Sequence, residues 1–282
     1  MGFSRYDVLN PAGLVYSGAE RSQLVRRTYT LVLACVFVTM GGTWFGLQNE
    51  SIMVATAQHP IITMLLAMVP LFAAQAMRNL SAPQRLGLVV LFSAMMGVSI
   101  SPVIYVLGRT QPQVIWQAGA LTASAFTVLT AYAWLSRRDF SAWGGFFVVG
   151  LWVLIATSLI NLFFQNQTAH LWIAGATVMV FSGLLVFDTW RLRNVYGPDQ
   201  YIQAAVQIYL DLLNMFMAIL ARFQGPSIVL AISGAREATA QEDQVLNNVV
   251  EEMAIAGGIP KPKIYVIDDA APNAFATGTD PD

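Results

Sequence analysis

Charged residues are scarce in this chain. Only 11% of its residues are Asp, Glu, Lys or Arg, whereas 56% are hydrophobic, and the mean hydropathy is +0.57. Soluble globular proteins carry about 25% charged residues. The composition therefore excludes that class and indicates a membrane protein. The formal net charge of −1, without a cluster of basic residues on one face, argues against a nucleic-acid partner.

Cysteine and histidine are also nearly absent. The single cysteine, Cys35, lies in an apolar run, which excludes an intrachain disulfide framework. The two histidines, His59 and His170, lie far apart at the edges of different apolar segments. A zinc peptidase needs two histidines one helical turn apart in an H-E-x-x-H motif. We therefore expect no zinc site and no enzyme.

The polar N-terminal region predicts no removable signal peptide.

Long apolar runs, in contrast, fill most of the chain. A helix needs about 20 apolar residues to cross a bilayer, and seven segments reach or approach that length. They are Thr28–Leu47, Pro60–Met77, Leu86–Leu107, Val114–Ser136, Phe140–Phe164, His170–Trp190 and Tyr201–Ala221. Brief polar separators predict antiparallel neighbours in one all-α seven-helix membrane bundle. The expected parts are a segment of residues 1–27, a membrane domain of residues 28–224, and a tail of residues 225–282.

Basic residues indicate the orientation of this bundle. Ten arginines precede the first segment or lie in the second, fourth and sixth loops, against only Arg109 in the other loops. Cytoplasmic loops are enriched in Lys and Arg. The pattern therefore predicts a cytoplasmic N-terminus.

Two acidic residues, Asp188 and Asp211, interrupt the last two apolar segments. An ionised carboxylate in the hydrocarbon region costs from about 2.5 to more than 10 kcal/mol, so we expect a proton- or cation-handling site. If consecutive antiparallel helices bring both carboxyls together, the pair can share a proton. For Asp188 alone, an interfacial ion pair with Arg191 is the simpler alternative.

The last segment carries its polar residues in a stripe. Gln203, Gln207, Asp211 and Asn214 are spaced so that they stack along one helical face. Because polar groups avoid lipid, this face should point into the bundle. The amides could equally serve as interhelical hydrogen-bonding groups without further function. Two glycine pairs, Gly41-Gly42 and Gly144-Gly145, predict close helix contacts.

The phrases SGLLVFDTWRLRNVYG and QIYLDLLNMFMAIL resemble the closing signature of the Bax inhibitor/YccA-like transmembrane family, and the similarity spans about residues 21–224. The resemblance implies a seven-helix bundle with the seventh helix at its centre and, in some members, a pH-sensitive calcium leak. It places the family's di-aspartyl sensor on Asp188 and Asp211. It places the arginine that latches one carboxylate in a bacterial relative on Arg78. An acidic residue that some relatives carry in the second helix is missing here.

The tail changes in composition after the predicted helix breaker Gln224-Gly225-Pro226. A capping box at Thr239-Ala-Gln-Glu242 predicts a helix to about Ala256, closed by Gly257-Gly258, and KPKIYVID predicts a short strand. The phrase VVEEMAIAGGIPKPKIYVIDDAAPNAFATG resembles the start of HtpX-type membrane zinc metallopeptidases. Because the zinc motif is missing, we expect a truncated, incomplete metallopeptidase-like segment.

Two functions of different classes follow. The preferred one is a calcium leak channel, an ion-transport protein whose pH sensor is the aspartate pair. The alternative is a non-enzymatic regulator that binds membrane proteases, or the membrane half of a truncated metallopeptidase fusion. The lipid bilayer is a partner in each case. The two resemblances together suggest a bacterial inner membrane.

Overall fold

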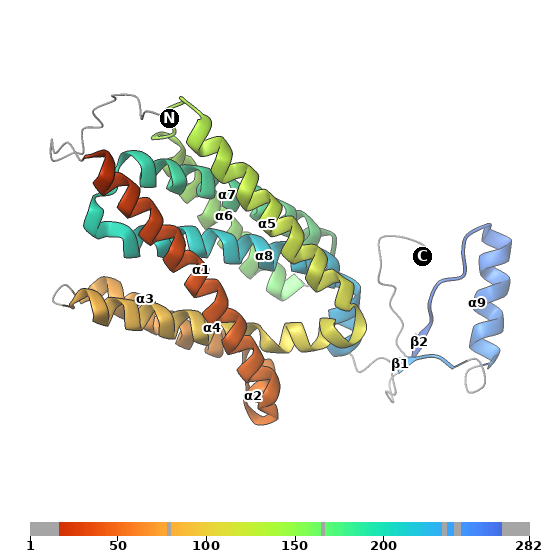
Figure 1. Ribbon diagram of the computed structural model, residues 1–282. Coiled ribbons are helices and arrows are strands. Elements are labelled where there is room, and N and C mark those ends of the chain that lie inside the picture. The colour runs from red at the N-terminus through yellow and green to blue at the C-terminus, as the bar shows by residue number, and fades with distance from the viewer. Residues whose placement is uncertain (1–16, 78–79, 165–166, 233–235, 240–243, 267–282) are drawn as a thin grey trace. The chain divides into compact units, whose positions relative to one another are not determined.

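The computed structural model describes residues 17–77, 80–164, 167–232, 236–239 and 244–266. The chain forms two units, Met1–Leu220 and Ala221–Asp282, and the boundary falls inside the eighth helix. Helices dominate the first unit. They are α1 (Gly18–Gln48), α2 (Glu50–Gln58), α3 (Pro60–Ala76), α4 (Ala82–Thr110), α5 (Pro112–Leu135), α6 (Trp143–Phe164), α7 (Gln167–Asn194), the short 3-10 helix η1 (Pro198–Gln200) and α8 (Tyr201–Ile232) (Figure 1).

Several helix starts follow from local sequence. Ser17 accepts a hydrogen bond from the Glu20 amide (3.3 Å), and the Glu20 carboxylate accepts one from the Ser17 amide (2.8 Å). Ser81 and Gln84 form the same reciprocal capping box at α4. Such boxes satisfy backbone donors that the first helical turn leaves free. Prolines at the first turns of α3, α4 and α5 lose no helical hydrogen bond there.

Six described helices, α1 and α4 to α8, are long and apolar enough to cross a membrane, and the number reaches seven if the bent pair α2–α3 counts as one span. The pair bends by 104° at His59, directly before Pro60. The sequence predicts a loop where α2 lies, so α2 is an addition to the predicted architecture. The nearly all-helical membrane bundle is confirmed.

Helix α8 is the most buried candidate span. Inside the structure, 61% of its apolar window is buried, against 17–39% for the other long spans. Figure 1 shows α8 running through the middle of the helices of the first unit. The core around it draws residues from α1, α3, α4, α7 and α8, and its largest fully buried members include Leu24, Phe92, Leu185, Leu192, Ile208, Tyr209 and Met215. This burial agrees with the central position expected for the seventh span.

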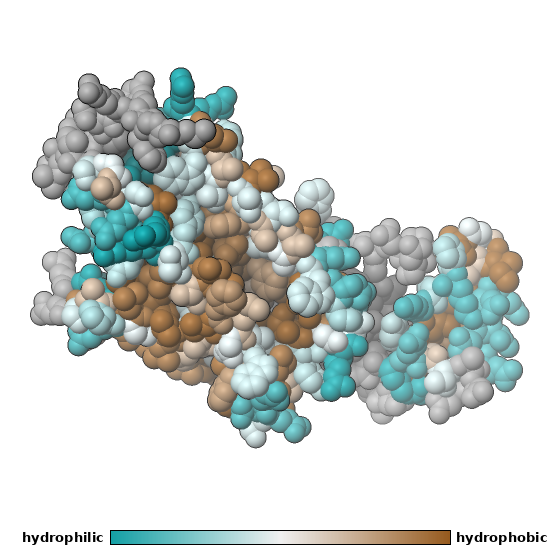
Figure 2. All heavy atoms as spheres, viewed as in Figure 1, coloured by the Kyte–Doolittle hydropathy of each residue, from teal (hydrophilic) through white to brown (hydrophobic). Residues whose placement is uncertain are grey.

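The outer surface of the bundle is apolar. Large hydrophobic side chains stand exposed on several helices, among them Trp44, Phe72, Trp152 and Phe163. Figure 2 shows hydrophobic residues gathered over the body of the bundle. Contiguous apolar surface of this extent marks an interaction surface, and on helices of this length the partner is the hydrocarbon of a bilayer.

Helices α1 and α4 pack closely along a seam where their backbones meet. A Cβ added to Gly42 would lie 2.2 Å from the Ala94 carbonyl oxygen, and one added to Gly97 would lie 2.1 Å from the Thr39 carbonyl oxygen. The Thr43 hydroxyl crosses the contact and donates to the Gly97 carbonyl oxygen at 3.0 Å. The seam therefore depends on residues without a side chain, as in other membrane helix pairs.

The predicted glycine contacts are confirmed for one member of each pair. Gly144 lies against the Phe187 ring, where an added Cβ would be 2.5 Å away. Gly41 and Gly145 have open space around the position of a Cβ, so the predictions for them are wrong. Neighbouring helical positions point about 100° apart, so only one residue of a pair can face a given helix.

The second unit contains α9 (Gln244–Gly257) and the antiparallel strands β1 (Arg236–Glu237) and β2 (Tyr265–Val266). Gly258 adopts a φ of 63°, and the Ile259 amide donates to the Ala254 carbonyl oxygen at 3.1 Å. This left-handed glycine ends α9 as predicted. The predicted strand is confirmed in β2. Most of the predicted capping box, and the segment APNAFATG, lie outside the described residues.

The predicted helix break at Gln224-Gly225-Pro226 is wrong, because α8 continues through these residues to Ile232. A proline inside a helix removes one backbone hydrogen bond at a cost of about 3 kcal/mol. That cost kinks or weakens a long helix but need not end it.

The α1–α4 seam generates the first prediction. We expect Gly97→Ala to destabilise the protein by about 1–3 kcal/mol, because the new methyl group overlaps backbone atoms of α1. Gly87→Ala in the same helix meets nothing within 4 Å and should be neutral or stabilising by up to about 1 kcal/mol. Thermal unfolding in detergent measures both. Equal unfolding temperatures for the two variants would refute the tight seam.

Candidate functional site

A short corner brings α7 and α8 together. The amides of Val195 and Tyr196 both donate to the Arg191 carbonyl oxygen, at 2.7 and 3.0 Å, and this turn ends α7. Gly197 and Pro198 then lead through η1 into α8. Asp188 lies about two turns before the end of α7, and Asp211 about three turns into α8. The two helices therefore present their acidic residues from adjoining elements.

Asp188 and Asp211 are both buried, with 7% and 4% of their surface exposed. Their carboxyl groups lie close enough to one another to interact electrostatically. A hydrogen bond between two carboxyl groups forms only when one of them carries a proton. No N–H or O–H group of the described residues donates to the buried Oδ2 of Asp211. The structure therefore places the two aspartates near one another, and their sharing of a proton stays a prediction.

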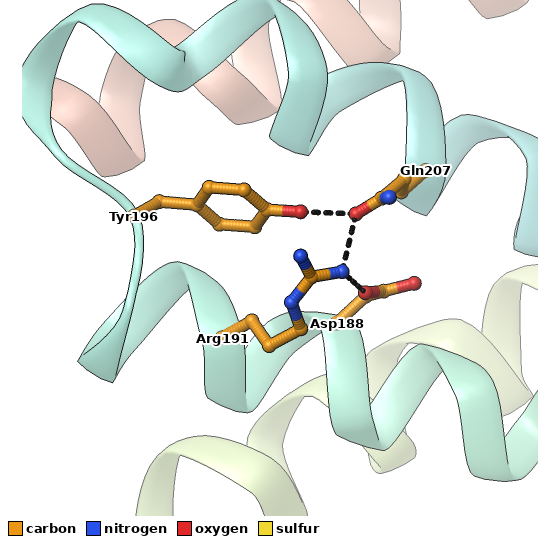
Figure 3. Close-up of polar contacts among 4 residues, drawn as sticks. All are labelled: Asp188, Arg191, Tyr196 and Gln207. Carbon is orange, nitrogen blue, oxygen red and sulfur yellow. Dashed lines mark hydrogen bonds and ion pairs between the residues drawn. The ribbon is translucent and has the colours of Figure 1, made fainter. Parts of the chain in front are cut away.

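Asp188 also forms an ion pair. Its Oδ1 accepts a hydrogen bond from Arg191 Nη1 at 3.0 Å, and the same nitrogen donates to Gln207 Oε1 at 2.9 Å. The Tyr196 hydroxyl donates to the same Gln207 oxygen. Figure 3 shows these four side chains converging from the end of α7, the corner and α8. The ion pair considered as an alternative for Asp188 is therefore present, and Asp211 lies near the same carboxyl group.

Two aromatic rings hold the Arg191 guanidinium. Its central carbon lies 4.7 Å from the Tyr196 ring centre and 5.5 Å from the Phe187 ring centre. The side chain is 25% exposed, whereas that of Asp188 is 9% exposed. Cation–π contacts of this kind stabilise by about 0.5–2 kcal/mol. Arg191 thus reaches inward from a partly exposed position to a buried carboxylate.

Other arginines at this corner bind backbone. Arg21 of α1 donates to the carbonyl oxygens of Leu192 (3.2 Å) and Tyr196 (2.7 Å). Arg193 donates to the carbonyl oxygens of Ala133, Trp134 and Ser136 at the end of α5. The last carbonyl groups of a helix lack intrahelical partners, so these contacts complete the ends of α7 and α5 and fix the corner to its neighbours.

The predicted polar stripe of α8 is only partly turned inward. Gln207 and Asp211 lie in the site, whereas Gln203 is exposed. The Asn214 amide donates to the Leu210 carbonyl oxygen of its own helix at 2.8 Å.

Arg78, the predicted latch, lies outside the described residues. Tyr196 is a contributor that the sequence does not single out, because it follows α7 in a polar turn that carries no motif.

Several long apolar helices around a buried acidic pair define an integral, multispanning membrane protein. The family model described as "Inhibitor of apoptosis-promoting Bax1" matches residues 21–227. The chain therefore belongs to the Bax inhibitor family, and the predicted resemblance over this region is confirmed.

Named relatives agree with this assignment. The chain is 33% identical to Bax inhibitor 1 of Schizosaccharomyces pombe over 206 residues, which cover 71% of this chain and 75% of that protein. It is 27% identical to protein lifeguard 4 of Mus musculus over 200 residues, covering 71% and 84%. It is 38% identical to an uncharacterized membrane protein of Vibrio cholerae over 133 residues, covering 46% and 59%.

The Asp188–Arg191 contact generates the second prediction. We expect Arg191→Met to destabilise the protein by about 1–3 kcal/mol, since it leaves a buried carboxylate without its cation. Solvent screens the pair because Arg191 is partly exposed, and this limits the loss. The double variant Arg191→Met/Asp188→Asn should recover part of the loss, because the uncompensated charge is gone. Thermal unfolding in detergent measures each variant.

The exposed Arg138 offers a matched control, and Arg138→Met should change the free energy of unfolding by less than about 0.5 kcal/mol. An Arg191→Met variant as stable as Arg138→Met would show that the ion pair contributes nothing.

Proposed function

We propose that this protein is a pH-sensitive cation leak whose pH sensor is the Asp188–Asp211 pair, with calcium as the transported ion. The observation that carries the proposal is the proximity of two buried carboxyl groups inside candidate membrane spans. Intramembrane acidic residues typically mark ion pathways or proton relays. Carboxylate oxygens are also the ligands that calcium prefers.

The charges of the site give a mechanism for gating. With one shared proton, the pair carries one negative charge, and Arg191 balances it. Loss of the proton leaves two adjoining carboxylates against one guanidinium. Two like charges about 4 Å apart repel by about 4 kcal/mol at an effective dielectric constant of about 20. That energy shifts a two-state equilibrium by about a thousand-fold.

This repulsion would separate α7 from α8 at the level of the pair. Separation admits water, and the exposed negative charge attracts a cation. In this proposal the pair that shares a proton is the closed state, and deprotonation opens the pathway. Arg78 would act as a second cation that latches a carboxylate in one state, as the family resemblance implies.

Orientation and surroundings belong to the same proposal. The arginine distribution supports a cytoplasmic N-terminus, which puts the α7–α8 corner on the cytoplasmic side. The bacterial inner membrane suggested by the two sequence resemblances remains a prediction. The family match ends at residue 227, and α9 lies beyond it. The metallopeptidase resemblance of this tail remains a prediction, as does a role as a partner of membrane proteases.

Calcium flux into proteoliposomes tests the proposal and gives the third prediction. We expect flux through the unaltered protein to rise with pH, because deprotonation drives the opening. Asp211→Asn should abolish this pH dependence, since an amide donates to Asp188 at every pH and cannot release the proton. The measurement is the initial rate of calcium entry, reported by a trapped dye, at a series of pH values.

A matched control is Asp199→Asn, which makes the same exchange at the exposed η1 and should keep the pH profile. Liposomes without protein set the background. A full pH response in Asp211→Asn would contradict the role of the pair, and no flux through the unaltered protein would contradict the leak itself.

A further inference from the structure

We propose that Tyr196 and Gln207 are positioning residues that hold Arg191 against Asp188 and so set the pH at which the aspartate pair responds. This inference rests on the proposed gating by the pair. It concerns two neutral side chains that neither form the pair nor carry its charge. The set of Tyr196, Gln207 and Arg191 is called the corner clamp below.

Gln207 is the centre of the corner clamp. Its Oε1 accepts hydrogen bonds from both Arg191 Nη1 (2.9 Å) and the Tyr196 hydroxyl. An amide oxygen has two lone pairs, so this atom is saturated by the two donors. Both donors require the oxygen, and not the amide nitrogen, to face them. The amide orientation, visible in Figure 3, is therefore fixed by its neighbours.

Arg191 consequently bridges two helices. One nitrogen, Nη1, donates both to Asp188 of its own helix and to Gln207 of α8. A flexible arginine side chain loses rotamer freedom when it is held in one position. Gln207 and the Tyr196 ring hold Arg191 in one position, and they do so independently of its contact with Asp188. The ion pair is therefore preorganised, which strengthens it relative to a free side chain.

Tyr196 is itself anchored on several sides. It is 2% exposed, its carbonyl oxygen accepts from Arg21 of α1 at 2.7 Å, and its amide donates to the Arg191 carbonyl oxygen at 3.0 Å. Its ring lies under the Arg191 guanidinium. Contacts from α1, α7 and α8 therefore fix the hydroxyl that donates to Gln207.

None of the three side chains of the corner clamp gains or loses a proton in the pH range in which carboxylic acids titrate. Burial raises the pKa of Tyr196; the nearby Asp188 and Asp211 act in the same direction, against the opposing effect of Arg191. The hydroxyl therefore stays protonated and remains a donor at physiological pH. Gln207 has no titratable group, and arginine keeps its charge in proteins. Any pH response of the corner must come from the aspartates.

Several charged and titratable groups of the described residues lie at this corner. They include Asp188, Arg191 and Arg193 of α7, Tyr196 of the turn, Asp211 of α8, Arg21 of α1, which binds the backbone of the turn, and Arg27 of α1, which lies over the Tyr201 ring. Arg191 is the member of this set that contacts a carboxylate of the pair. Its position therefore controls how strongly the negative charge at Asp188 is balanced.

Loosening the corner clamp should weaken that balance. A carboxylate that loses part of its cation binds a proton more tightly, so a higher pH is needed to remove the proton. Tyr196→Phe removes only the hydroxyl and keeps the ring under Arg191. Gln207→Met keeps the length of the side chain and removes the acceptor. We expect each to move the midpoint of the calcium flux profile upward by about 0.5–1 pH unit.

The experiment compares calcium flux into proteoliposomes against pH for the unaltered protein, the two single variants and the double variant. Because both act through Arg191, the double variant should shift no further than Gln207→Met alone. The control is Tyr105→Phe, whose ring lies by Arg109 on α4 and not at the corner. The inference would be overturned if the flux midpoints of both single variants lay within about 0.2 pH units of the midpoint of the control, a difference on the order of measurement error.

A second readout separates this inference from the proposed function. The unfolding temperature in detergent, measured against pH, reports protonation of the pair without any flux. If the unaltered protein shows no flux, the leak proposal fails, and the dependence of the unfolding temperature on pH alone tests the corner clamp. A pH dependence in Tyr196→Phe equal to that of the unaltered protein then overturns the role of the corner clamp. If Gln207→Met does not fold, Tyr196→Phe decides the outcome, since it retains the buried ring.

Discussion

Two carboxyl groups buried side by side in an apolar bundle need a proton between them and a cation beside them, because no bulk water solvates their charge. The structure shows the cation, since Arg191 pairs with Asp188. The proposed function supplies the proton, which Asp188 and the neighbouring Asp211 would share. Desolvation makes this arrangement costly unless every charge is balanced. The same cost makes the site respond strongly when the proton leaves.

The rest of the bundle divides into fixed and adaptable parts around this pair. The α1–α4 seam is closely packed at Gly42 and Gly97, and backbone contacts by Arg21 and Arg193 fix the ends of α7 and α5. Packed cores of this kind resist gradual deformation and favour two discrete arrangements. Movement is therefore expected where polar side chains, and not packed backbones, join α7 to α8.

The architecture was largely predictable from the sequence, because bilayer thickness sets the length of apolar helices and the membrane makes acidic residues conspicuous. The meeting of Asp188 and Asp211 was predictable for the same reason. The bend between α2 and α3, and the continuation of α8 past Pro226, were not, since a proline weakens a helix without fixing whether the helix bends, ends or continues. Nor was the exposure of Gln203, since a periodic pattern does not show where a helix leaves the bundle. Tyr196 escaped prediction because the geometry of its turn, and not any motif, brings its hydroxyl to Gln207.

The central claim is that Asp188 and Asp211 share one proton that leaves as the pathway opens. Infrared difference spectroscopy of the protein in lipid tests this most directly, because a protonated carboxyl has a C=O stretch that a carboxylate lacks. The account predicts a carboxyl band that disappears as pH rises, over the same range as calcium flux, and that is absent from Asp211→Asn. A band that persists unchanged across that range, or that survives in Asp211→Asn, would contradict the account.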